Sequence, residues 1–389
     1  MTRAVVGACG LAVATGWNVA NTGAIAQALA AEYGVGLAAI GLLTTALFVV
    51  HLVVQIPGGR ASDRFGPKRI GMLGLALLAL CNGLALLVPS FPLGMVMRSL
   101  MGIGTGLAFV AGADYVRAQG ASASAQGLFG GAGVAGGGLA LAVVPQVEDW
   151  LGWRGPYATA AIVAVAALAA LAVAPRDVPR SVHLHEGAAP PGIFRDVRLY
   201  RLGLMYAATF GLSIVAGNWV ATLLERGGGQ SQEVAGAVAA LTLLLGIVTR
   251  PLGGWLLRWR PQWTRTIVVG SLLACGVGSL LVAAAEPIAL VVLGATMIGL
   301  AAGLPFAPAF LGAAQTRPDA PATAIGFVNG SAALLIVVGS PLLGLAFSLP
   351  GDGRVGFVAT AAVWLLAVLV VPSERELGVP AVTAATGSR

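Results

Sequence analysis

Residues 58–69 read GGRASDRFGPKR and lie between two long apolar stretches, residues 37–58 and 69–89. A membrane protein has few places for a dense cluster of charges, because ionisable side chains are costly inside the bilayer. A short charged turn between two membrane-spanning helices is one such place, and glycines at 58, 59 and 66 bound this one. The stretch therefore predicts an all-α integral membrane protein.

The composition indicates the same class of protein. Of the 389 residues, 58% are hydrophobic and 10% are charged, whereas soluble domains carry roughly 25% charged residues. A water-soluble fold is thus excluded. Glycine is abundant, at 56 residues, and membrane helices use glycine for close backbone approach. The net charge of +7 does not indicate nucleic-acid binding, because the basic residues gather in alternate loops.

No pattern in the sequence predicts a metal site or a cofactor. Cys9, Cys81 and Cys275 lie in apolar segments at spacings that match neither a metal site nor a disulfide, so we interpret them as small apolar side chains. His183 and His185 have no cysteine or third histidine nearby, which favours a solvated loop. No nucleophile–base set lies at membrane depth, so the sequence does not support an enzyme.

The apolar pattern predicts twelve membrane-spanning helices, since each span needs about 20 apolar residues. The first apolar run continues to about Ala31, too far for a cleaved signal peptide. We expect an N-terminal half at 1–174, a cytoplasmic linker at 175–199, a C-terminal half at 200–372 and a tail at 373–389. The expected spans are 5–30, 37–58, 69–89, 93–115, 124–146, 156–174, 200–223, 233–257, 266–284, 288–312, 322–347 and 355–371.

The distribution of basic residues predicts the orientation. With the N-terminus inside, 17 of the 22 Lys and Arg residues fall on the cytoplasmic side, and only Arg154, Arg226 and Arg354 fall outside. The positive-inside rule then predicts a multi-pass protein of the cell membrane with both termini cytoplasmic. The cytoplasmic set is Arg3, Arg60, Arg64, Lys68, Arg69, Arg117, Arg176, Arg180, Arg195, Arg198, Arg201, Arg258, Arg260, Arg265, Arg317, Arg375 and Arg389.

The two halves repeat each other. QIPGG at 55–59 aligns with RPLGG at 250–254, an offset of 195 residues that pairs Gln55 with Arg250. A GxxxG pattern at 102–106 aligns with another at 299–303, at an offset of 197. Parallel repeats related by an axis along the membrane normal are one arrangement of transporter halves. The repeat predicts two pseudo-symmetric six-helix bundles.

Residues 58–69 resemble the loop between helices 2 and 3 of major facilitator superfamily transporters. Ala61 stands where the family usually has leucine, and Pro67 where it often has a basic residue. The resemblance implies that the loop is cytoplasmic and helps to close the inward side. The residues that carry it, which we expect to form a gating loop, are Gly59, Asp63, Arg64, Gly66, Lys68 and Arg69.

Arg250 is the main candidate for contacting a substrate. It lies two helical turns before Arg258, which should mark the cytoplasmic end of its helix, and so about 12 Å inside that end. At such depth an arginine must face protein, water or an anion, and its planar fork of donors suits carboxylate, nitrate or phosphate. Two interpretations stay open: an anion site in the central cavity, or a structural arginine bonded to backbone carbonyls.

The pattern RPLGG at 250–254 and the glycine-rich helix at 127–138 resemble the nitrate/nitrite porter branch of the family. In that branch an arginine from helix 2 and one from helix 8 hold the anion. Here Gln55 replaces the first arginine, so small organic anions are also open. Close packing of small residues is an alternative explanation for the glycines at 127–138.

Further polar residues at membrane depth complete the predicted substrate site. For His51 a hydrogen-bonded structural role is also open, and for Arg98 the alternative is a side chain that snorkels to the membrane surface. The predicted contacts are Arg250, Gln55, His51, Asn18, Asn21, Arg98, Asn218, Trp219 and Asn329.

The sequence favours a transporter of a small solute. No Asp or Glu lies near mid-membrane, so exchange or facilitated movement of anions fits better than carboxylate-driven proton symport. We expect a monomer in the lipid bilayer that moves a small anion by alternating access. An exporter of amphipathic drugs or metabolites is the alternative, although such exporters usually carry a glycine-proline pair in helix 5 that residues 127–138 lack.

Overall fold

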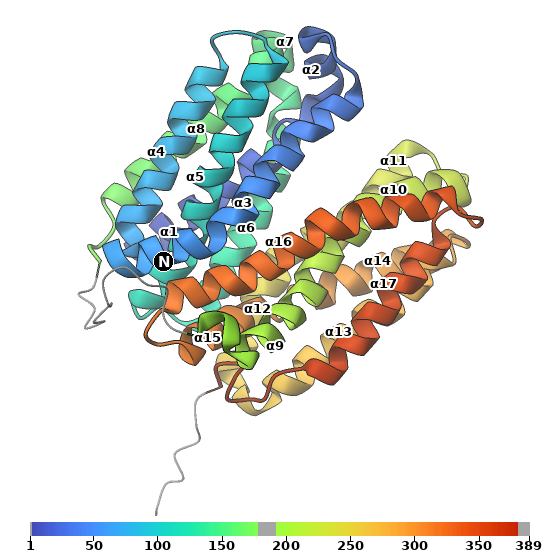
Figure 1. The fold of residues 1–389 in the computed structure, drawn as a ribbon. Helices are drawn as coiled ribbons and strands as arrows, with labels where there is room; N and C mark the ends of the chain where they lie inside the picture. Colours follow the sequence, from blue (N-terminus) through green and yellow to red (C-terminus); the bar gives the residue numbers. More distant parts are fainter. Residues whose placement is uncertain (1, 178–191, 380–389) are drawn as a thin grey trace, which may run out of the picture.

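The computed structural model describes residues 2–177 and 192–379, all of whose regular elements are helices. In Figure 1 they form two bundles. The first bundle contains α1 (Arg3–Ala20), α2 (Ala26–Tyr33), α3 (Leu37–Phe65), α4 (Pro67–Ala85), α5 (Phe91–Ala118), α6 (Ala123–Val143), α7 (Glu148–Leu151) and α8 (Gly155–Ala172).

The second bundle follows the linker. It contains α9 (Val197–Tyr206), a π-helix (Ala207–Gly211), α10 (Leu212–Gly227), α11 (Gln232–Leu244), α12 (Gly246–Trp259), α13 (Thr264–Ala283), α14 (Ile288–Ala302), α15 (Phe306–Thr316), α16 (Pro321–Leu345) and α17 (Arg354–Ala367).

Ten helical stretches of the described residues are long and apolar enough to cross a membrane. One of them, Ala123–Ala172, is 50 residues long and holds both α6 and α8, and Arg354–Val370 is a further, shorter apolar helix. The chain is thus an all-helical membrane protein. His183 and His185 lie outside the described residues.

The stretch that we predicted to be a loop is mostly helix. The prediction ended the second span at residue 58, but α3 continues to Phe65, so Asp63 and Arg64 lie on its last turn. Gly66, at a φ of 92° that few other residues adopt, ends α3, and α4 begins at once with Pro67. Only Gly66 is therefore a loop residue, and the charges are held rigidly by two helices.

The bundles meet along two seams, α3 against α16 and α6 against α12. Asp63 contacts Ala322 across the α3–α16 seam near the Gly66 turn, and further along a Cβ on Gly138 of α6 would lie 3.2 Å from Leu244 at the end of α11. We call the end of the molecule that carries the Gly66 turn the basic end. Toward the opposite end, which carries α2, α7 and α11, the ribbons of the two bundles diverge (Figure 1). The bundles are therefore closed against each other at the basic end.

Glycines at matching positions of the sequence repeat let the helix backbones approach closely at both seams. A Cβ on Gly59 would lie 2.6 Å from the carbonyl oxygen of Ala322, and a Cβ on Gly254 would collide with that of Ala123. Gly59 and Gly254 differ by the 195-residue offset of the sequence repeat. Close backbone approach through small residues is how membrane helices pack, so packing accounts for these glycines.

We expect Gly59→Ala to destabilise the closed basic end, because the added methyl group has no space between α3 and α16. Overpacking typically costs about 1–3 kcal/mol. Gly41→Ala is the matched control on the same helix, since a Cβ there meets nothing within 4 Å. Thermal unfolding in detergent should show a lower midpoint for the first variant only. Equal midpoints would mean that the seam can widen without cost.

Candidate functional site

Arg250 lies on α12 at the α6–α12 seam and is 5% exposed. Its Nη1 donates a hydrogen bond to the carbonyl oxygen of Gly130 on α6, at 2.7 Å. The guanidinium carbon lies 4.5 Å from the ring centroid of Phe210 and 4.9 Å from that of Phe306. Within the described residues no carboxylate pairs with it. Arg250 is thus a buried cation held by ring faces and one carbonyl.

An aromatic cluster that the sequence analysis missed surrounds this arginine. Phe306 stacks on Phe310 at 4.5 Å between centroids, and Tyr206 stacks on Phe210 at 5.4 Å. Each pair is spaced four residues apart, so both members project from one face of a helix. The cluster spans both bundles and comprises Phe109, Phe129, Tyr206, Phe210, Phe306 and Phe310.

The π-helix Ala207–Gly211 helps to place two of these rings. It contains Phe210, follows Tyr206 directly, and interrupts the span between α9 and α10. Such interruptions are frequent at functional sites. The hydroxyl of Tyr206 is buried and has no hydrogen-bond partner in the described structure. The site therefore combines a buried cation and an unused hydroxyl donor, both packed on Phe210 and Phe306.

Gln55 and Asn329 join the bundles at the other seam. Oε1 of Gln55 accepts a hydrogen bond from Nδ2 of Asn329 at 3.0 Å, and Nε2 of Gln55 donates to the carbonyl of His51 at 3.2 Å. The sequence repeat pairs Gln55 with Arg250, but α3 packs on α16 whereas α12 packs on α6. The structure thus engages the Gln55 amide with Asn329 and with its own helix.

His51 is buried beside the aromatic cluster. Its Nδ1 lies 3.0 Å from Oγ1 of Thr105, and its ring packs 6.5 Å from that of Phe109. The hydroxyl of Thr105 also donates to the carbonyl of Gly102. His51 therefore touches the edge of the site through Phe109 and has a hydrogen-bond partner of its own.

Arg98, Asn18 and Asn21 form a separate network inside the first bundle. Arg98 Nη1 donates to the carbonyl of Asn18 at 2.6 Å and to Oδ1 of Asn21 at 3.1 Å, and its Nε donates to the carbonyl of Leu43. All three predicted contacts are fully buried, and the bonds tie α1, α3 and α5 together. These bonds run within one bundle and give the three residues a structural role, and their contact with a substrate stays a prediction.

Asn218 and Trp219 join α10 to α16. Nδ2 of Asn218 donates to Oγ of Ser340 at 3.2 Å, and Nε1 of Trp219 donates to the backbone carbonyl of Ser340 at 2.9 Å. Trp219 also packs against Phe347. Asn218 is exposed, so it has room to meet a solute, whereas Trp219 serves packing within the second bundle.

Asp63 closes the α3–α16 seam. Its carboxylate accepts hydrogen bonds from the backbone N–H groups of Ala322 and Thr323, each at 2.9 Å, and from the hydroxyl of Thr323 at 2.6 Å. These groups form the N-terminus of α16, where the helix dipole favours an anion. We call this set of contacts the Asp63 latch. The sequence placed a gating residue here but could not name its partner.

The other members of the predicted gating loop act within the first bundle or face outward. Lys68 Nζ donates to the carbonyls of Ala172 and Ala174 at the end of α8, and its backbone N–H donates to Asp177. Arg64 and Arg69 are exposed. Gly59 and Asp63 are the two of the six that meet the opposite bundle among the described contacts, at Ala322 and Thr323.

Comparison with known proteins points to one family. Residues 6–340 match the model of the Major Facilitator Superfamily. The "Probable nitrate/nitrite transporter NarK2" of Mycobacterium tuberculosis is 30% identical over 327 residues, 81% of this chain and 80% of that protein. The "Gentisate transporter" of Corynebacterium glutamicum is 26% identical over 55% of this chain and 52% of its own length.

A solved structure agrees in fold. The transporter FucP in the outward conformation is similar with a TM-score of 0.74 and 14% sequence identity, over 95% of this chain and 97% of FucP. The family match, the NarK2 identity and this likeness agree, and the chain belongs to the major facilitator superfamily of membrane transporters.

Proposed function

We propose that this transporter carries small anions by alternating access, with Arg250 as the main contact. The observation that supports this proposal most directly is a buried guanidinium at a bundle seam that no described carboxylate neutralises. A buried charge needs a counter-charge to be inexpensive, and a small anion from the solvent can supply one. Arginine also binds planar oxyanions through paired donors.

The relatives support an anion as substrate. The names of two of them refer to nitrate or nitrite and to gentisate. Arg250 here acts without a second arginine, since Gln55 occupies the repeat position and bonds Asn329. One cation packed on two rings of an aromatic cluster favours a small anion with a planar or apolar body over a strongly hydrated one. Tyr206 supplies a second donor to the same anion.

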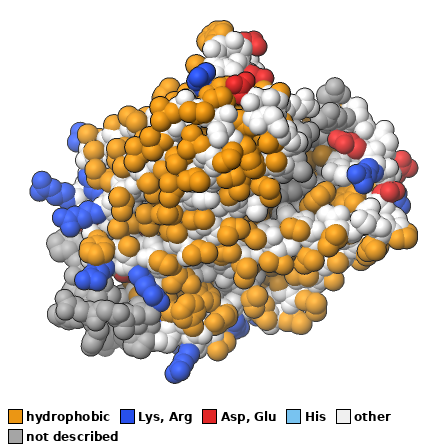
Figure 2. All heavy atoms as spheres, turned by 45° about the horizontal axis from the view of Figure 1, so that its top comes forward, with side chains coloured by type: hydrophobic (Ala, Val, Ile, Leu, Met, Phe, Trp, Pro, Cys, Tyr) orange, Lys and Arg blue, Asp and Glu red, His pale blue; other side chains and the backbone are white. Residues whose placement is uncertain are grey.

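The proposal includes twelve membrane crossings in two pseudo-symmetric bundles. The ten long stretches become twelve when α6 and α8 are counted separately and α17 is included. Figure 2 shows hydrophobic side chains as a broad belt, with Lys and Arg gathered at one end and Asp and Glu mainly at the other. Under the positive-inside rule the basic end is cytoplasmic, and the carrier, closed there, faces outward.

A thermal-shift screen of the purified protein tests the substrate class. Nitrate, nitrite, formate, oxalate and an aromatic carboxylate are compared with amphipathic cations at equal ionic strength. We expect at least one anion to raise the unfolding midpoint in a saturable way. Stabilisation by cations alone would sink the anion proposal and favour the drug exporter.

Tyr206→Phe sharpens this test. The hydroxyl is buried without a partner, and such a group costs about 1–3 kcal/mol, so its removal should raise the stability of the empty carrier. The same change should weaken anion binding about threefold to tenfold, because one donor is lost. A variant that is more stable yet binds the anion as well as wild type would exclude Tyr206 from the site.

A further inference from the structure

A pocket of about 500 Å³ lies at the basic end of the second bundle, away from the aromatic cluster. Arg201 on α9 and Arg265 on α13 line it, together with the segment that follows α17. That segment is tied in place, because Arg201 donates to the carbonyl of Val371 at 3.0 Å and pairs with Glu376 at 3.1 Å. The pocket is lined by Arg201, Arg265, Val371, Ser373, Glu374 and Arg375.

Two of the three arginines that line this pocket have no ion-pair partner among the described residues. Arg201 is paired with Glu376, but neither Arg265 nor Arg375 has a side-chain hydrogen bond or ion pair among the described residues. Glu374 is the acidic residue in the lining. The pocket therefore keeps a positive excess, and guanidinium groups from two separate segments suit an anion with several oxygens.

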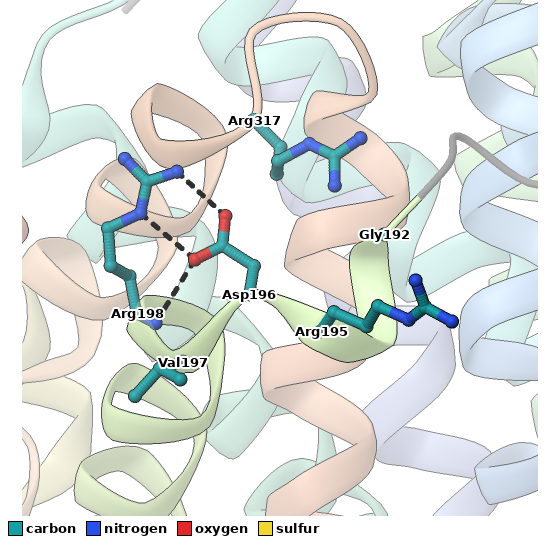
Figure 3. A pocket seen from close by; sticks show the side chains of 6 residues that line it. All are labelled: Gly192, Arg195, Asp196, Val197, Arg198 and Arg317. Carbon is teal, nitrogen blue, oxygen red and sulfur yellow. Dashed lines mark hydrogen bonds and ion pairs between the residues drawn. The ribbon is translucent and has the colours of Figure 1, made fainter.

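A second basic pocket at the same end differs in this respect. Figure 3 shows Arg195, Arg198 and Arg317 around it, with Asp196 bonded to Arg198. Arg317 likewise bonds Asp319. Each arginine lowers the pKa of its aspartate partner through the hydrogen bond, so both aspartates are ionised at neutral pH. Two of the three arginines in that pocket are thus paired with an aspartate, whereas in the pocket at Arg265 one of the three, Arg201, is paired with a carboxylate.

Exposed tryptophans mark the depth of the Arg265 pocket. Trp259 and Trp263 are 57% and 59% exposed, and Trp263 lies two residues before Arg265. Trp255 stacks on Trp259 at 4.8 Å. Tryptophan concentrates at the headgroup level of a bilayer. Trp263 therefore indicates that the start of α13, which carries Arg265, lies near the headgroup level.

We propose that this pocket binds the phosphate headgroup of an anionic phospholipid from the adjacent leaflet, held by Arg265 and Arg375. Basic pockets between helix ends on the cytoplasmic side bind such headgroups. A bound headgroup would join α13 to the segment after α17, and so stabilise the basic end of the second bundle. This inference is independent of the transported solute.

Native mass spectrometry and thermal unfolding of the full chain test the proposal. The protein is loaded with phosphatidylglycerol or phosphatidylcholine in the same detergent. We expect phosphatidylglycerol to give more bound lipid and a higher unfolding midpoint. In the double variant Arg265→Gln/Arg375→Gln, the preference for phosphatidylglycerol over phosphatidylcholine should fall roughly thirtyfold. Each of the two arginines attracts the anionic headgroup, and the variant loses both contributions.

The control is Arg3→Gln/Arg258→Gln, which removes the same charge from exposed positions and should keep the preference. Inorganic phosphate and glycerol phosphate form the last arm. Equal stabilisation by free phosphate would assign the pocket to a soluble anion and overturn the lipid proposal. Equal binding of both lipids by the wild type would overturn it even if the double variant failed to fold.

Discussion

Arg250→Ala is expected to abolish saturable anion exchange in proteoliposomes while the protein stays folded. The substitution removes the buried cation and its contacts with Phe210 and Phe306. It leaves the carbonyl of Gly130 without this donor, a cost of about 1–3 kcal/mol that the bundle should tolerate. Counterflow uptake, with a size-exclusion profile as the folding check, measures both effects.

Two further variants make the result specific. Arg250→Lys keeps the charge but loses the planar fork, and should weaken binding by about 1–3 kcal/mol, roughly five- to 150-fold. Arg354→Ala removes an exposed arginine from the opposite end and should exchange like wild type. Wild-type exchange by a well-folded Arg250→Ala protein would make this arginine structural and remove the main support for anion transport.

Asp63→Asn should slow exchange about tenfold or more with folded protein still recovered. The carboxylate accepts from two backbone N–H groups and one hydroxyl of α16. The amide replaces one acceptor by a donor, so a backbone N–H at the end of α16 loses its partner. Hydrogen bonds to charged groups contribute about 1.5–3 kcal/mol, so the closed basic end should lose roughly ten- to 100-fold in population.

A milder variant measures how much the hydroxyl contact alone contributes to the Asp63 latch. Thr323→Val removes only the hydroxyl that donates to Asp63 and keeps both backbone bonds, so its effect should be smaller. Exchange rates in liposomes of one composition measure the series. An Asp63→Asn carrier that exchanges at the wild-type rate would show that the Asp63 latch does not control the transport cycle.

The sequence predicted local features well and distant partners poorly. The resemblance around Asp63 implied a gating residue at the end of a helix, but it could not name the partner on α16, which is 259 residues away in the chain. The depth of Arg250 followed from helical rise alone. Its ring partners did not, because Phe210 and Phe306 look like ordinary apolar residues until the helices of the second bundle pack together. Tyr206 with Phe210 and Phe306 with Phe310, each four apart, were the available signal.

The same limit applies to the residues that the structure places inside one bundle. Arg250 was ranked above Arg98 and Asn21 for its depth, but all three entered the predicted site as polar residues within spans, because a sequence gives the height of a side chain in a span more readily than its facing direction. The structure turns Arg98 toward α1 and α3, and Arg250 toward α6. Rotation about the helix axis depends on packing partners, and these become known only with the fold.

If Arg250 contacts the solute as proposed, its bond to Gly130 would connect solute binding to the conformational equilibrium. The bond crosses from α12 to α6, so the proposed solute contact also contributes to the free energy that holds the two bundles together. A ligand shifts a conformational equilibrium only by its differential affinity for the two states. An anion that draws the Arg250 guanidinium away from the Gly130 carbonyl removes a contact that only one of the two conformations makes. The empty and loaded carriers then differ in their preferred conformation through a single thermodynamic linkage.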